Sequence, residues 1–181
     1  MPVPQMLSEK FSDPFSRSRR KEPISNDAMI LTGNFDKDLA SRVASMVGKE
    51  IPKLSVRRFA DGEVAVRIDE SVNGKHCYII QSSSPPVNDN LMELILLISA
   101  CKRGGAHRVT CIVPYYGYAR QERRDERISP ISSSDVAQIL EHVGADHIVA
   151  MDLHSPAIQG ATTPKVCFDN ISVFSTGLSY F

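Results

Sequence analysis

Hydrophobic and polar positions follow two periods along the chain from residue 28 onward. Short apolar runs typical of strands alternate with stretches whose apolar residues recur at helical spacing. The predicted strands cover residues 29–31, 54–59, 64–68, 78–80, 109–113, 148–151 and 165–168, and the predicted helices cover residues 37–47, 91–101 and 136–142. Helices that separate strands in this way indicate βαβ units, and therefore an α/β fold with a mostly parallel sheet and helices on both faces.

Polar residues and glycines mark the expected ends of these elements. The candidate N-caps of the helices are Asp36, one of Asn88 and Asp89, and one of Ser132, Ser133 and Ser134. Asp61-Gly62 between two predicted strands is typical of a hairpin turn. Ligands of parallel sheets bind beyond the carboxyl ends of the strands. We therefore expect the loop 114–127 and the segment 152–154, which both follow apolar strands, to share one edge of the sheet.

The loop 114–127 reads PYYGYARQERRDER. The guanidinium groups of Arg120, Arg123 and Arg124 can bind phosphate oxygens or stack on a nucleobase. The four arginines of the loop stand against three acids, which leaves a net charge of +1 and suits one chosen ligand better than any polyanion. Two interpretations remain open from these residues: a site for a phosphorylated ligand, or a solvated loop held by salt bridges.

Two shorter segments carry further candidate chemistry. Residues 59–63 read FADGE, which is either an ordinary hairpin tip or a platform on which Phe59 stacks against a base and the acids accept hydrogen bonds. Asp152 and His154 alternate at a strand end and can face the same way. They could hold Mg²⁺, directly or through water, or His154 could simply be buried and satisfied by a neighbour. The remaining histidines are expected at the surface: His76, His107, His142 and His147.

Composition narrows the classes of protein. Lys and Arg balance Asp and Glu at 21 each, which argues against a further interpretation of the whole chain as a nucleic-acid-binding module that uses the arginine loop and the basic N-terminal residues. The sequence has no GxxxxGK[ST] and no GxGxxG after its first strand, so neither a P-loop nor a dinucleotide-binding Rossmann domain is expected. No apolar run approaches the roughly 20 residues of a membrane span. The four cysteines, which fit no CxxC pattern, are expected to be small buried side chains in a reducing compartment: Cys77, Cys101, Cys111 and Cys167.

The first 28 residues differ from the rest of the chain. They contain four prolines and the basic cluster Arg17-Ser-Arg-Arg-Lys21, and they lack the apolar region of a signal peptide. We expect residues 1–28 to form a disordered arm and residues 29–181 to form one domain. Organelle targeting is the alternative for the arm, and Glu9 and Asp13 argue against it.

Five motifs in a fixed order point to one family. They are RFADGE at 58–63, NDNLMEL at 88–94, the segment 114–125 with its YARQ core, Pro130-Ile131, and MDLHS at 151–155 followed by Gln159-Gly160. The chain resembles the ribose-phosphate pyrophosphokinases, or phosphoribosyl pyrophosphate synthetases, over about residues 29–181. The resemblance implies a phosphoribosyltransferase-type domain of a cytoplasmic enzyme of nucleotide biosynthesis. Such enzymes transfer diphosphate from Mg-ATP to ribose 5-phosphate and so form phosphoribosyl pyrophosphate and AMP.

The resemblance also implies roles for individual residues. The implied ATP-binding residues are Phe59, Asp61, Gly62, Glu63, Arg120, Gln121 and Asp125. In the family the hairpin reaches the ATP of a neighbouring subunit, which implies a homo-oligomer whose ATP sites are shared between subunits. His154 is implied as the catalytic residue beside the triphosphate. The implied ligands of the Mg²⁺ cofactor are Asp152, His154 and Asp169.

Some positions depart from the family pattern. Glu122 stands where members commonly have Asp, and Asn73 stands where many regulated members have an Arg of a phosphate-effector site. The spacing from Asp152 to Asp169 is slightly longer than in the family. The family's ribose 5-phosphate loop, paired acids followed by a Thr/Gly-rich turn, does not occur in the sequence.

We therefore expect the family's second domain to be absent, and the 181 residues to have low solubility and little activity by themselves. The alternative is a non-catalytic subunit that associates with a full-length synthetase and regulates it. In either case the expected small-molecule partners are ATP and ribose 5-phosphate, with no nucleic acid and no membrane.

Overall fold

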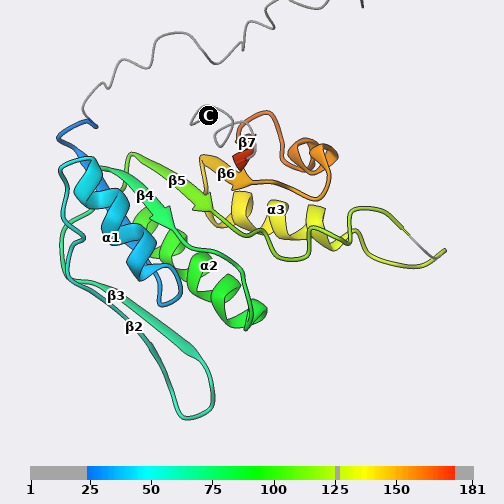
Figure 1. Cartoon of the computed structure of the whole chain (residues 1–181). Helices are drawn as coiled ribbons and strands as arrows, with labels where there is room; N and C mark the ends of the chain where they lie inside the picture. The colour runs from blue at the N-terminus through cyan, green and yellow to red at the C-terminus, as the bar shows by residue number, and fades with distance from the viewer. Residues whose placement is uncertain (1–23, 125–126, 174–181) are drawn as a thin grey trace, which may run out of the picture.

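The computed structural model of the chain describes residues 24–124 and 127–173. Five strands form one sheet in the order β1-β4-β5-β6-β7, and β2 and β3 form a separate two-stranded hairpin (Figure 1). The elements in chain order are β1 (Ala28–Thr32), α1 (Lys37–Met46), β2 (Leu54–Arg58), β3 (Val64–Ile68), β4 (His76–Ile80), α2 (Val87–Arg103), β5 (Arg108–Val113), α3 (Ser132–Val143), β6 (His147–Met151), the 3-10 helix η1 (Pro156–Ala161) and β7 (Cys167–Ile171).

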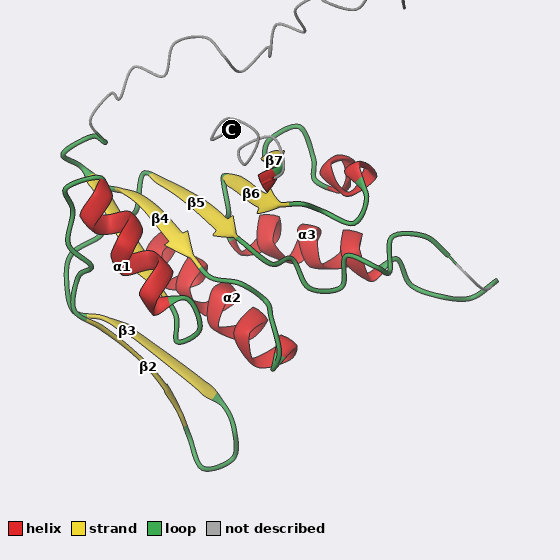
Figure 2. Cartoon of the chain, viewed as in Figure 1, coloured by secondary structure: helices red, strands yellow, loops and turns green. Residues whose placement is uncertain are grey.

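The main sheet is parallel throughout, since each of its four neighbouring strand pairs runs in the same direction. Helices connect β4 to β5 and β5 to β6, which places those strands side by side as βαβ units (Figure 2). The hairpin of β2 and β3 is antiparallel and lies in the connection between α1 and β4. The predicted α/β fold with a mostly parallel sheet is confirmed.

Helices cover both faces of the sheet, as predicted. α2 and α3 pack on one face, where Leu97 and Leu140 are fully buried in the main core. α1 packs on the opposite face, where Ala40 lies in a second cluster with Ile30 and Ile80. Figure 1 shows α1 in front of the sheet and α2 and α3 behind it.

The predicted helix caps are wrong in detail. Asp36 occupies the N-cap position of α1 but makes no cap bond, because its carboxylate instead accepts a hydrogen bond from the Ser82 backbone N–H. α2 starts before Asn88 and Asp89, so both lie in its first turn and their side chains bind other elements. Likewise α3 begins at Ser132, after Ile131 at the N-cap position. The side chains that local sequence predicted as helix caps instead interact with residues of other elements.

The last strand begins later than predicted. Residues 163–166 form a turn closed by a hydrogen bond from the Val166 backbone N–H to the Thr163 carbonyl at 3.0 Å. β7 therefore starts at Cys167, which is exposed, whereas the other three cysteines are buried. The prediction of four buried cysteines is wrong for Cys167, because a strand at the sheet edge packs one face only.

Of the four histidines predicted at the surface, His107 and His142 are exposed, and the other two differ from the prediction. His76 and His147 are the first residues of β4 and β6 and are partly buried. The His76 ring stacks on Tyr78 at 4.1 Å, and desolvation with the nearby Arg108 charge lowers the pKa of His76.

Residues 1–23 of the expected arm lie outside the described residues. Among the residues that are described, no helix has the length and apolar character to cross a bilayer.

Candidate functional site

A cavity of about 590 Å³ opens at the carboxyl ends of β5 and β6. Its walls come from three segments: the start of α2, the loop after β5 from Tyr115 to Gln121, and the segment Met151–His154 after β6. The sequence predicted that the arginine loop and the Asp152–His154 segment share one edge of the sheet, and this is confirmed.

The three tyrosines of the loop lie in different environments. The buried Tyr116 donates its hydroxyl hydrogen to the Ser133 carbonyl oxygen at 3.0 Å, and burial raises the pKa of Tyr116 above its ordinary value. The Tyr118 hydroxyl donates to Asn88 Oδ1 at 2.5 Å and so joins the loop to α2. Tyr115 is half exposed and lines the cavity. The loop therefore presents aromatic surface to the cavity while Tyr116 anchors it to α3.

A close backbone contact fixes the direction of this loop. The Gly117 backbone N–H donates to Ser83 Oγ at 2.7 Å. A Cβ at Gly117 would lie 2.8 Å from the Ser83 carbonyl oxygen, closer than real Cβ atoms come, so only glycine fits. Tyr118 follows with φ of 63°, a left-handed conformation that surrounding contacts must hold. This turn directs the chain toward Arg120.

Arg120 and Gln121 line the cavity, and both are exposed. Gln121 Oε1 accepts a hydrogen bond from Ser132 Oγ at 2.6 Å, and its backbone oxygen accepts one from the Ser133 N–H at 3.2 Å. These bonds attach the loop to the first turn of α3. An exposed guanidinium beside aromatic rings can bind phosphate oxygens or stack on a base. Asp125, the remaining implied ATP-binding residue of this loop, lies outside the described residues.

Asp152 and His154 line the same cavity. Asp152 has φ of 44°, and its carboxylate accepts hydrogen bonds from the Val173 backbone N–H at 3.2 and 3.3 Å. His154 is exposed, so the interpretation of it as a buried, satisfied histidine is wrong. Mg²⁺ prefers oxygen ligands, and the cavity offers the Asp152 carboxylate. The residues present therefore fit an ion held by Asp152 together with water and ligand oxygens, with His154 beside it.

The hairpin tip has the predicted turn. Gly62 has φ of 95°, and Asp61 Oδ1 accepts a hydrogen bond from the Glu63 backbone N–H at 3.1 Å. Phe59 is 59% exposed, which leaves its ring free to contact another molecule. The two strands of the hairpin are antiparallel over their whole length.

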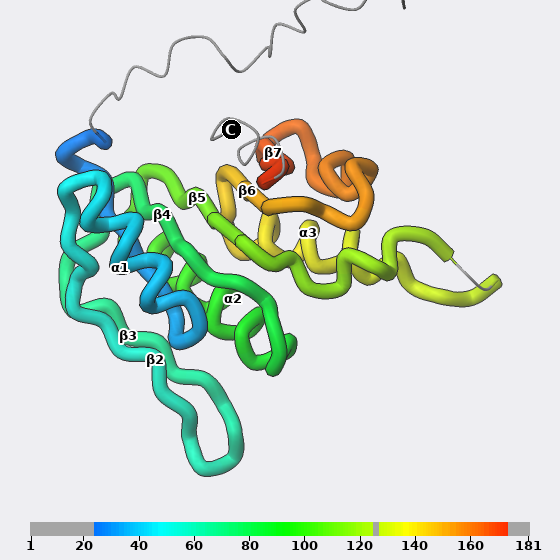
Figure 3. Tube along the Cα trace, in the orientation of Figure 1, coloured from blue at the N-terminus to red at the C-terminus, as the bar shows by residue number. Residues whose placement is uncertain are grey.

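None of the tip residues 59–63 lines the cavity. Next to the tip, Arg58 pairs with Asp89 in the first turn of α2 at 2.7 Å, whereas the base of the hairpin packs against the main core through Val66 and Ile68. Beyond that base the hairpin extends away from the sheet (Figure 3). The residues at 59–63 therefore do not join the cavity walls of the same chain.

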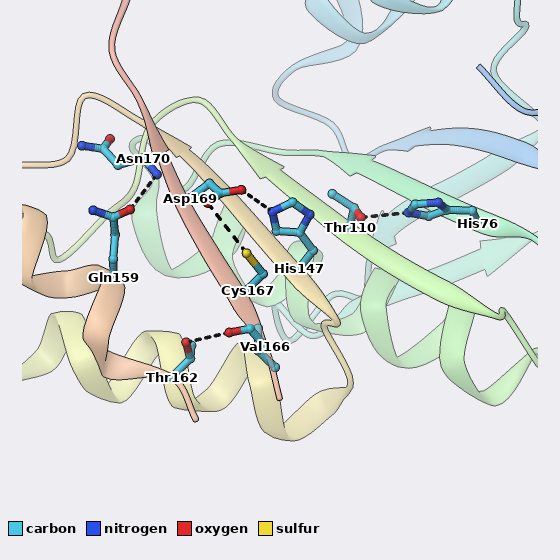
Figure 4. Close-up of polar contacts among 9 residues, drawn as sticks. All are labelled: His76, Thr110, His147, Gln159, Thr162, Val166, Cys167, Asp169 and Asn170. Atoms are coloured by element: carbon cyan, nitrogen blue, oxygen red, sulfur yellow. Dashed lines mark hydrogen bonds and ion pairs between the residues drawn. The ribbon is translucent and has the colours of Figure 1, made fainter. Parts of the chain in front are cut away.

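Asp169 is not brought to the cavity either. It lies within β7, beside Val149 of β6, and its Oδ2 lies 2.8 Å from His147 Nε2 (Figure 4). Asp152 and His154 lie beyond the end of β6. The structure thus separates Asp169 from the other two implied magnesium ligands, because the turn at 163–166 starts β7 late and leaves Asp169 inside the strand.

Sequence reasoning missed a buried polar network beside the site. Glu93 of α2 is only 1% exposed, and its carboxylate accepts hydrogen bonds from the Asn34 backbone N–H at 2.8 Å and the Asn34 Nδ2 at 2.9 Å. Gln81 Oε1 accepts one from the Gly33 backbone N–H at 3.1 Å. The network fixes the loop after β1. The sequence signal for this network was Glu93, a charged residue within the apolar run 91–98.

Comparison with known proteins gives a consistent result. Residues 28–144 match the family described as the N-terminal domain of ribose phosphate pyrophosphokinase. Ribose-phosphate pyrophosphokinase 1 of Streptococcus pneumoniae serotype 4 is 47% identical over 135 residues, which cover 75% of this chain and 42% of that protein. Ribose-phosphate pyrophosphokinase of Bacillus subtilis is 47% identical over 131 residues, covering 72% of this chain and 41% of that one.

A solved structure agrees with these relatives. The crystal structure of phosphoribosylpyrophosphate synthetase from Mycobacterium smegmatis superposes with a TM-score of 0.80 at 38% identity, covering 84% of this chain and 51% of that chain. The chain spans less than half the length of the curated relatives named above. The matched family domain, the relatives and the shared fold together show that the chain belongs to the ribose-phosphate pyrophosphokinase family.

Proposed function

We propose that the chain supplies the ATP-binding part of a ribose-phosphate pyrophosphokinase. The observation that carries this proposal is the cavity that Arg120 and Gln121 share with Asp152 and His154. A cationic side chain, aromatic walls and an oxygen donor for a metal ion around one space suit a magnesium nucleoside triphosphate. The names of the relatives support ATP and ribose 5-phosphate as the substrates.

The proposed reaction needs no protein nucleophile. The 1-hydroxyl oxygen of ribose 5-phosphate bonds to the β-phosphorus of ATP, the bond from that phosphorus to the α,β-bridging oxygen breaks, and the hydroxyl proton is released. AMP leaves and phosphoribosyl pyrophosphate forms. Such transfers depend on positioning and on charge neutralisation more than on covalent catalysis. A bound Mg²⁺ would supply part of that neutralisation.

The cavity residues have distinct proposed roles. The Arg120 guanidinium binds phosphate oxygens, and Gln121, held by Ser132, positions the end of the loop. Asp152 holds the metal ion by its carboxylate. His154 lies beside the reacting phosphate, and Asp125 is assigned to ATP by family resemblance.

We further propose that the hairpin completes the ATP site of a second copy of the chain. Within one chain the exposed tip does not line the cavity, so its residues need another molecule to act on. Phe59 would stack on the adenine, and the carboxylates of Asp61 and Glu63 would accept hydrogen bonds from it or from the ribose, with Gly62 shaping the turn. Such an assembly is a homo-oligomer with shared sites, and we place it in the cytoplasm.

AMP release from Mg-ATP, with and without ribose 5-phosphate, tests the reaction. We expect little or no AMP from the 181-residue chain, because the sequence has no paired acids followed by a Thr/Gly-rich turn for the sugar phosphate. A fusion to the remaining part of the Bacillus subtilis relative should restore ribose-dependent release. A well-folded fusion that binds other subunits but releases no AMP would contradict the enzymatic role and favour a regulatory subunit.

A further inference from the structure

A cluster of three different metal-binding side chains lies on the sheet surface, apart from the cavity. His147 Nε2 is 2.8 Å from Asp169 Oδ2, and Cys167 Sγ is 3.7 Å from Asp169 Oδ1. One ligand atom from each residue lies within 4.8 Å of the others. Figure 4 shows the three side chains directed toward one another from β6 and β7. We propose that His147, Cys167 and Asp169 bind a divalent ion of the zinc class.

The parallel sheet explains why these residues meet. His147 of β6 is directly opposite Cys167 of β7, and Val149 is opposite Asp169. Cys167 and Asp169 are two positions apart on one strand, so their side chains emerge on the same face. The register therefore places a nitrogen, a sulfur and an oxygen donor around one point, although the two strands are separated in sequence by the segment 152–166.

The donor set selects the class of ion. Zn²⁺ is bound by imidazole nitrogen, thiolate sulfur and carboxylate oxygen, whereas Mg²⁺ takes oxygen ligands. Zn–N distances of about 2.0 Å and Zn–S distances of about 2.3 Å put tetrahedral ligand atoms roughly 3.5 Å apart. The separations of the ligand atoms run from 2.8 Å to at most 4.8 Å and so bracket that value, and changes of roughly 1 Å in these separations would enclose an ion. Three protein ligands would leave a fourth position for water, as in open zinc sites.

The ion would replace two existing hydrogen bonds. Asp169 accepts them from His147 and from the Cys167 thiol. Because the Cys167 thiol donates a hydrogen bond to Asp169, the sulfur carries a proton before the ion arrives. Binding breaks the S–H bond, forms the metal–sulfur bond and releases the proton to solvent. His76 is a separate histidine on β4, and its Nε2 lies 2.9 Å from Thr110 Oγ1, with Thr110 between it and His147 (Figure 4).

The site is accessible from solvent. Cys167 is exposed, and the side chains of Asp169 and His147 are 55% and 21% exposed. It also differs in place and chemistry from the proposed ATP site, whose metal donor Asp152 lies beyond the end of β6. Failure of either proposal therefore leaves the other standing.

Titration of the purified chain with Co²⁺ tests the proposal, because thiolate bound to Co²⁺ gives a charge-transfer absorption. The other three cysteines are buried, so the signal reports on Cys167. We expect the band to appear on titration, to disappear when Zn²⁺ is added and to persist in excess Mg²⁺. Cys167→Ser should abolish it, and His147→Gln should weaken Co²⁺ binding at least about tenfold. The matched control His142→Gln changes an exposed histidine on α3 and should have no effect.

A second measurement uses the unaltered chain and so does not depend on the folding of variants. Bound Zn²⁺ should slow the alkylation of Cys167 by iodoacetamide, whereas Mg²⁺ should not. Mass spectrometry of the peptide that contains Cys167 measures the alkylation rate. Absence of the charge-transfer band, its survival in Cys167→Ser, or an alkylation rate that Zn²⁺ leaves unchanged would each overturn the proposal.

Discussion

The cavity and the hairpin tip carry residues of the same proposed ATP site, yet they are built differently. The cavity loop is fixed from several sides, with Tyr116 buried on α3 and Gly117 in close contact with Ser83. The hairpin tip is held by its own turn and is exposed, with open space around Gly62. A fixed surface suits the reacting phosphates, whereas a projecting tip suits contact with another molecule. The difference indicates why one chain holds both parts without joining them.

The largest expected effect concerns the cavity. Arg120→Ala removes the proposed charge-assisted hydrogen bonds to phosphate and should weaken Mg-ATP binding roughly 10- to 100-fold. Calorimetric titration with Mg-ATP measures this change. Arg103→Ala, a matched loss of an exposed arginine at the end of α2, should leave the affinity unchanged. Equal affinities of the two variants would remove Arg120 from the site.

Two glycine substitutions compare the rigidity of the two regions. Gly117→Ala places a methyl group against the Ser83 carbonyl and the Val87 side chain and should cost about 3 kcal/mol of unfolding free energy. Gly62→Ala meets no neighbour and carries only the left-handed backbone penalty, about 1 kcal/mol. Urea unfolding of both variants gives the two values. A larger loss of unfolding free energy for Gly62→Ala than for Gly117→Ala would contradict the conclusion that the cavity loop is the more rigid of the two regions.

The smallest expected effect concerns the attachment of the hairpin. Arg58 and Asp89 form an ion pair at 2.7 Å in which both side chains are more than a third exposed. Arg58→Ala should therefore lower the unfolding free energy by less than about 1 kcal/mol. Thermal unfolding at low and high salt measures it, and high salt should reduce the difference from the unaltered chain. A loss of several kcal/mol would show that the pair matters far more than its exposure indicates.

Local sequence patterns predicted the elements of this fold and the edge of the sheet at which the cavity lies, because periodicity reports which side of an element is buried. Sequence patterns gave wrong predictions where a side chain binds a residue that is far away in the sequence. Asp36 binds Ser82 instead of capping α1, and Glu93 holds Asn34 from inside the core. The register that joins His147 to Cys167 is likewise non-local. The turn before Cys167 did have a local signal, Pro164 at its second position, which the predicted strand from residue 165 did not take into account.

The most direct test of the shared ATP site mixes two impaired chains. Phe59→Ala and Arg120→Ala should each bind Mg-ATP weakly, since one lacks the hairpin contact and the other lacks the cavity cation. After subunit exchange at equal amounts, about one quarter of the sites should combine an intact cavity with an intact hairpin from a second copy. Calorimetric titration should then show tight binding at that fraction of sites. A mixture that binds no better than its components, or a Phe59→Ala chain that binds as tightly as the unaltered one, would contradict the account.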